Sequence, residues 1–110
     1  MQQRGAVRVT PRSAVTVAIE NQGYPMAYGV VANISENGAC LWTNGAFAVG
    51  ESLVVRLSFP RLSQPLQAAG SVVWEDRQRD EKGAMRLGLR WSHTTGPAHL
   101  HLKQLIDSST

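Results

Sequence analysis

The chain has 110 residues, 43% of them hydrophobic, and its 11 Lys and Arg against 8 Asp and Glu give a formal net charge of +3. This length suits one domain with one core. It contains no apolar run near the ~18 residues of a membrane helix and no signal-peptide segment at its start, which predicts a soluble, cytoplasmic protein or domain without direct membrane insertion.

Residues 1–12 are expected to form a flexible N-terminal arm. Arg4, Arg8 and Arg12 lie in this arm, which has no acidic residue, so its natural partners are anions. Pro11 and the β-branched residues around it disfavour a helix. Arg4 and Arg8 would then be two guanidinium forks on a flexible or looped arm that can close around an anion. Taken alone, such a pair is more often part of an ordinary solvated leader segment.

The pattern from residue 13 onward is that of a β-barrel. Apolar and polar residues alternate over residues 14–20, 52–59 and 84–91, which is typical of half-buried antiparallel strands. Less regular apolar runs complete a set of six strands at residues 28–33, 39–43 and 66–74, with turn formers such as "NQGYP", "SENG" and "PRLSQP" between them. These segments predict a mainly β fold, a six-stranded antiparallel barrel whose closure removes exposed edges.

The end of the chain has helical rather than strand periodicity. Pro97 follows Gly96 and suits the first position of a helix. Apolar residues then recur at helical spacing, at Ala98, Leu102, Leu105 and Ile106. We therefore expect a short C-terminal helix packed on the barrel or across its end, within a domain that spans residues 13–110.

The sequence contains no recognisable catalytic or metal-binding signature. G-x-S-x-G, P-loop and G-x-G-x-x-G motifs are all missing. His99 and His101 are two residues apart on the expected helix, so their side chains diverge. The single cysteine, Cys40, lies in an apolar run typical of a buried small side chain. An enzyme is not expected, and neither is a metal or other cofactor.

The segment "NISENG", residues 33–38, places polar groups between two apolar runs. Asn33 and Ser35 are two apart, so in an extended strand an amide and a hydroxyl point to the same side. Asn37-Gly38 predicts a two-residue type I′ turn, with Gly38 either at positive φ or open to close approach by a ligand. An Asx or Ser turn leading into a hairpin is the alternative explanation for the polar pair.

Several segments together resemble one known family across nearly the whole chain: "RGAVR", "GVVANISENGACL", "VGESLVVRLSFP", "GSVVW" and "MRLGLRW". They are similar to the PilZ domain family, bacterial receptors for the second messenger cyclic di-GMP. The resemblance implies a non-catalytic receptor or switch domain on a barrel with a closing helix. Arg4 and Arg8 would hold phosphate oxygens and the Hoogsteen edge of a guanine. Asn33 and Ser35 would contact a guanine on the barrel surface, and Gly38 would shape the turn.

Three further positions bear on the resemblance. Asn33 stands where the family often has Asp, and an uncharged amide receives guanine donors less strongly. Gln3 precedes Arg4 where the family often has additional arginines, and the residue there influences how many ligands are held. Trp74 ends the strand "GSVVW" and presents its ring to a base, as in related domains, or else packs in the core or at the rim.

Two other functions stay open at this point. One is a protein-interaction adaptor on the same barrel with a weak or unused nucleotide site, which the Asn33 substitution favours. The other is an OB-like barrel for single-stranded nucleic acid, which the pI of 9.6 and three tryptophans permit. The arginines concentrated at one end argue against nucleic acid. The leading expectation is a cyclic di-GMP receptor that acts on a downstream protein partner or an attached effector domain.

Overall fold

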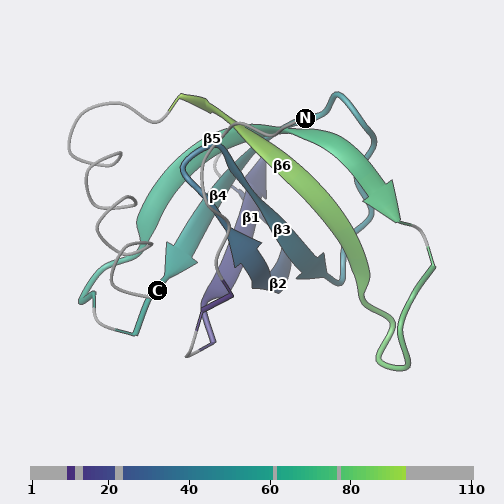
Figure 1. Cartoon of the computed structure of the whole chain (residues 1–110), viewed down its shortest axis with the longest axis horizontal. Helices are drawn as coiled ribbons and strands as arrows, with labels where there is room; N and C mark the ends of the chain where they lie inside the picture. Colours follow the sequence, from purple (N-terminus) through teal and green to yellow (C-terminus); the bar gives the residue numbers. More distant parts are fainter. Residues whose placement is uncertain (1–9, 12–13, 22–23, 61, 77, 94–110) are drawn as a thin grey trace, which may run out of the picture.

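The computed structural model of the chain describes residues 10–11, 14–21, 24–60, 62–76 and 78–93, and these residues form a closed β-barrel (Figure 1). Neighbouring strands are antiparallel throughout, in the order β1-β2-β3-β6-β5-β4 around the barrel. The strands are β1 (Thr16–Asn21), β2 (Tyr24–Ile34), β3 (Gly38–Thr43), β4 (Ser52–Ser58), β5 (Leu66–Asp76) and β6 (Met85–His93). The predicted six-stranded antiparallel barrel is confirmed.

Two expected features lie outside the described residues. The expected C-terminal helix, including His99 and His101, falls within residues 94–110. Most of the expected arm, including Gln3, Arg4 and Arg8, falls within residues 1–9. Both features therefore stay predictions.

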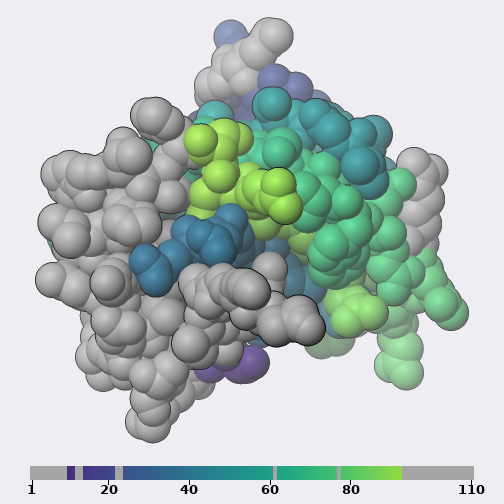
Figure 2. All heavy atoms as spheres, turned by 45° about the horizontal axis from the view of Figure 1, so that its top comes forward, coloured from purple at the N-terminus to yellow at the C-terminus, as the bar shows by residue number. Residues whose placement is uncertain are grey.

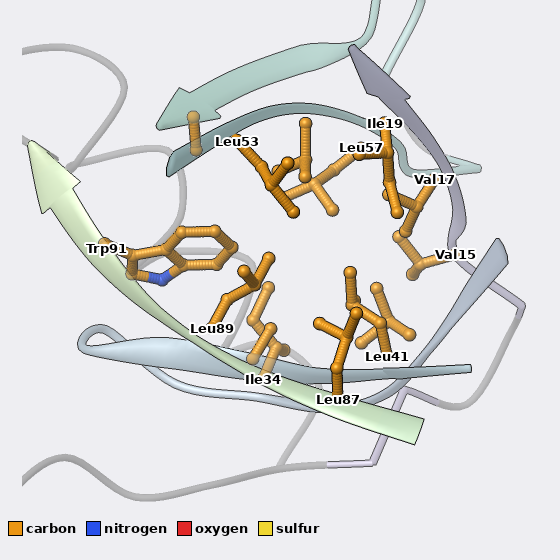
Figure 3. Packing of buried hydrophobic residues seen from close by; sticks show 14 of the residues in the cluster. Val15, Val17, Ile19, Ile34, Leu41, Leu53, Leu57, Leu87, Leu89 and Trp91 are labelled. Carbon is orange, nitrogen blue, oxygen red and sulfur yellow. The ribbon is translucent and has the colours of Figure 1, made fainter. Parts of the chain in front are cut away.

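The core is built from the alternating residues that point into the barrel (Figure 3). In β4 and β6 the apolar residues of the alternating pattern are buried and the arginines between them are exposed, as predicted. Trp91 belongs to this core, with its indole between Leu53 and Leu89 in the close view. Cys40 is also buried, as expected.

Strand β2 differs most from the sequence-based prediction. Tyr24 and Pro25 were expected in a turn, but both lie in the strand. The register with β1 shifts here, because Ile19 faces Ala27 while Glu20 faces Pro25. Such a bulge tolerates a proline, which cannot donate to the hydrogen-bond ladder. The outer face of β2 carries apolar side chains that the sequence analysis did not single out: Tyr24, Met26, Tyr28 and Val30.

Candidate functional site

The β2–β3 hairpin carries the polar motif, and its turn lies one residue earlier than predicted. Ile34 pairs with Ala39, and the Ser35 N–H donates a hydrogen bond to the Gly38 oxygen at 2.8 Å. The loop residues are therefore Glu36 and Asn37. The predicted Asn37-Gly38 turn is wrong, because the strand register brings Gly38 into β3.

Gly38 is needed for a close approach between strands. The described glycines with positive φ are Gly50 and Gly83, so Gly38 does not supply a left-handed turn residue. A Cβ atom built on Gly38 would lie 1.9 Å from the backbone oxygen of Leu89 in β6. The glycine thus lets β3 and β6 pack together beneath the hairpin.

Ser35 uses its hydroxyl within the hairpin. The hydroxyl accepts a hydrogen bond from the Asn37 N–H at 3.1 Å and faces the Gly38 oxygen at 3.5 Å. Only 2% of Ser35 is exposed. The alternative of a Ser turn therefore describes this side chain, and a direct contact between its hydroxyl and a ligand stays a prediction.

Trp91 fixes the same hairpin from the core. Its indole Nε1–H donates to the Ser35 oxygen at 3.1 Å, and its backbone N–H donates to the Asn37 oxygen at 2.8 Å. The alternation over residues 84–91 predicted a strand that includes Trp91, but it did not predict this anchoring role. The turn that follows Asn33 is thus held at three points, by the Ser35–Gly38 pair and by two bonds from Trp91.

One row of residues crosses four strands on the outside of the barrel. Asn33 pairs with Cys40, Cys40 with Gly88, and Gly88 with Trp74. Directly paired residues of antiparallel strands share a face, and Cys40 lies between the core residues Ala39 and Leu41. The register shifts between Val31 and Asn33 and between Val72 and Trp74 pair Asn33 with Cys40 and Trp74 with Gly88. Asn33 and Trp74, two predicted site residues, therefore lie on the same outer face.

The Trp74 indole covers Gly88. A Cβ atom on Gly88 would lie 2.1 Å from Nε1 of Trp74, so the ring rests on the bare backbone of β6. The side chain is outside the barrel, and 40% of Trp74 is exposed. Of the roles considered for Trp74, packing in the core does not apply, whereas stacking on a base and packing at the rim both stay predictions. The ring is held against the barrel wall with part of its surface accessible.

Two arginines flank Gly88 on β6, and β6 lies at the surface between β5 and the β2–β3 region (Figure 2). Arg86 forms an ion pair with Asp76 at 3.3 Å, and its guanidinium lies 5.3 Å from the ring centre of Trp42. The pKa of Asp76 lies below its ordinary value because the backbone N–H of Gln78 donates to its carboxylate, with a further contribution from Arg86. Arg90 is exposed on the other side of Gly88.

The face thus offers a partly exposed aromatic ring, an amide and a cation, which suit a flat ligand with hydrogen-bonding edges and negative charge. Within the described residues, no three His, Cys, Asp or Glu side chains gather as metal ligands. In the same part of the chain no helix is long and apolar enough to cross a membrane.

Comparison with known proteins gives a family match and several structural likenesses. A family model described as PilZ domain matches residues 2–108. No curated protein sequence matches the chain. Among solved structures, the PilZ domain of Escherichia coli YcgR with c-di-GMP has a TM-score of 0.76 at 13% identity, covering 98% of this chain and 92% of that one.

Two longer proteins contain the same fold. The Bacillus subtilis inhibitor of motility MotI/DgrA has a TM-score of 0.75 at 21% identity over 98% of this chain. Escherichia coli YcgR in complex with c-di-GMP has a TM-score of 0.78 at 11% identity over 97% of this chain. The chain spans about half the length of each, 51% and 46%. At these identities the likeness concerns the fold.

Proposed function

Because the chain belongs to the PilZ domain family, we propose that it binds cyclic di-GMP on the outer face of β2, β3, β6 and β5 as a non-catalytic receptor domain. The row of Asn33, Cys40, Gly88 and Trp74 carries the proposal, since it brings an amide and an aromatic ring onto one wall of the barrel. The c-di-GMP complexes of YcgR support the choice of ligand.

The ligand groups match the side chains available on this wall. A guanine can stack on the accessible part of Trp74, because base–aromatic stacking needs only the face of the ring. The Asn33 amide can pair with a guanine edge through its oxygen and its NH₂ group. Ser35 and Gly38 hold the hairpin next to Asn33 in place. Ser35 does so through its buried hydroxyl, and Gly38 through the close approach of β3 to β6.

The phosphates are assigned to the N-terminal arm. Arg4 and Arg8 present two guanidinium groups, each able to hold a phosphate through a bidentate pair of hydrogen bonds. Gln3, beside them, influences how many ligand molecules the arm holds. Ordering the arm over the barrel costs conformational entropy, so affinity depends on the charge-assisted bonds that these arginines form.

We propose that ligand binding switches the domain between two states. Closing the arm over the ligand changes the surface that a downstream protein partner, or an effector domain of a longer protein, contacts in the cytoplasm. MotI/DgrA, which shares this fold, is an inhibitor of motility, and this supports a regulatory output of this kind. Nucleic acid is not the expected partner.

Calorimetric titration with cyclic di-GMP tests the proposal, with GTP as the competing nucleotide. We expect saturable, selective binding that Arg8→Ala abolishes. Arg56→Ala is the matched control, because Arg56 lies on β4, outside the proposed face, and is ion-paired with Glu20 of β1. No heat with a demonstrably folded protein would refute the receptor function.

A second function is favoured by Asn33, which is uncharged where the family often has Asp. In that case the barrel is a protein-interaction adaptor whose nucleotide site is weak or unused. The same titration separates the two functions. An adaptor would retain its protein partner with and without the nucleotide, and also after Arg8→Ala.

A further inference from the structure

Arg90 lies on the proposed ligand face at the point where the hairpin meets β6. It pairs with Gly38 of β3 on one side and with Ser71 of β5 on the other. Gly88, on which the Trp74 ring rests, is two residues before Arg90 on the same strand. The two residues are therefore about 7 Å apart along β6. Its side chain is exposed on this face.

Arg90 differs from the other described arginines in its contacts. Arg56 is paired with Glu20, Arg79 donates to the Gly83 oxygen, and Arg86 is held between Asp76 and Trp42. Within residues 10–11, 14–21, 24–60, 62–76 and 78–93, Arg90 forms no side-chain hydrogen bond, ion pair or ring contact. Its two strand neighbours, Gly38 and Ser71, carry no charge. Five N–H donors are thus available beside the ring and the hairpin.

We infer that Arg90 is a further anion-binding residue of this site, which holds a ligand phosphate from the barrel side. The inference rests on the proposed function and adds a residue outside both sequence motifs. Cyclic di-GMP has two phosphates on opposite sides of a closed ring. A ligand whose base rests on Trp74 places one phosphate near the barrel wall, within reach of the long Arg90 side chain. A guanidinium fork then replaces phosphate hydration with bidentate, charge-assisted bonds.

Arg86 provides the matched control for this inference. It lies on the same strand and face, four residues before Arg90, and is likewise exposed. Its guanidinium is already engaged by Asp76 and Trp42. Removing either charge changes the net charge of the protein equally, so a general change of the electrostatic field affects both variants alike. Only a direct contact distinguishes them.

The experiment is a cyclic di-GMP titration of the wild type, Arg90→Gln, Arg90→Lys and Arg86→Gln at low and high salt. We expect Arg90→Gln to raise Kd about tenfold, the loss of one charge-assisted interaction, and to reduce the salt dependence of Kd. Arg90→Lys restores part of the affinity, because it keeps the charge but not the fork. Arg86→Gln changes Kd less than about threefold. Urea unfolding verifies that all four proteins are equally folded.

The outcomes separate the inference from the function on which it rests. If the wild type binds and Arg90→Gln binds equally well, the inference is overturned while the receptor function stands. If Arg90→Gln and Arg86→Gln weaken binding alike, the effect is one of net charge, and the inference is again overturned. If the folded wild type does not bind at all, the proposed function fails and the inference falls with it.

Discussion

Trp91 donates a hydrogen bond from its indole Nε1–H to the backbone oxygen of Ser35, at 3.1 Å, from inside the barrel core. The same residue also donates its backbone N–H to the Asn37 oxygen. The position of the polar hairpin therefore depends on a core residue. Changes to core residues below it should move the proposed binding surface.

Replacing Trp91 with Phe tests this coupling. Phe keeps an aromatic ring in the core but leaves the Ser35 oxygen without its donor and fills less volume. We expect the free energy of unfolding to fall by about 2 kcal/mol and the affinity for cyclic di-GMP to fall with it. Urea unfolding and calorimetry measure the two effects. A Trp91→Phe protein that loses stability but binds with unchanged affinity would contradict the coupling.

Two glycines should respond differently to the same added methyl group. Gly38→Ala drives a Cβ atom against the rigid backbone oxygen of Leu89 and should cost about 2–3 kcal/mol of stability. Gly88→Ala meets only the partly exposed ring of Trp74, which can swing away, so its cost should be about 1 kcal/mol or less. Gly88→Ala should nevertheless weaken ligand binding, because the ring loses its support.

Unfolding curves and the indole N–H signal of Trp74 in NMR spectra test this pair. The signal should shift in Gly88→Ala before any ligand is added. Gly29→Ala serves as a control for the backbone clash, since its Cβ would lie 2.0 Å from the Trp42 oxygen. A Gly88→Ala variant that loses as much stability as Gly38→Ala would show that Trp74 cannot move.

Ser35→Ala tests the buried hydroxyl. The variant removes the acceptor of the Asn37 N–H and should lower the free energy of unfolding by about 1 kcal/mol without any ligand. Ser58→Ala, at the exposed end of β4, should change it by less than about 0.5 kcal/mol. Unaltered stability of Ser35→Ala, measured by urea unfolding, would mean that the hydroxyl does not support the hairpin.

Asp76 should make stability depend on pH in acid. Its pKa is lowered in the folded state by the Gln78 N–H and by Arg86, so its charge stabilises the fold above its ordinary pKa of 3.8. This contribution is lost as the pH falls through the lower folded pKa. Asp76→Asn should therefore lose less stability than the wild type when urea midpoints are compared at about pH 5 and at successively lower pH. Parallel curves for the two proteins would contradict this expectation.

The sequence was sufficient for the features that depend on local periodicity. Alternation over residues 52–59 and 84–91 predicted β4 and β6 and their buried sides because the period of a strand is a local property. The start of β2 was not predictable, since Pro25 signals a turn unless the partner strand supplies a bulge.

The site depends on pairings between distant segments. The need for glycine at position 38 comes from Leu89, and the orientation of Trp74 comes from Gly88. Both arise from the register of β6, which no local pattern reveals. The anchoring of Ser35 by Trp91 has the same origin. Sequence patterns identified Asn33, Ser35, Gly38 and Trp74 as candidates, but only the folded barrel relates them to one another.

An NMR titration of isotope-labelled protein with cyclic di-GMP, with GTP as the control nucleotide, tests the location of the site most directly. We expect the largest shifts at Asn33, Gly88, Arg90 and the Trp74 indole, with little change at the β1 and β4 residues on the other side of the barrel. Shifts confined to β1 and β4, or a spectrum unchanged by saturating ligand, would contradict the proposed binding face.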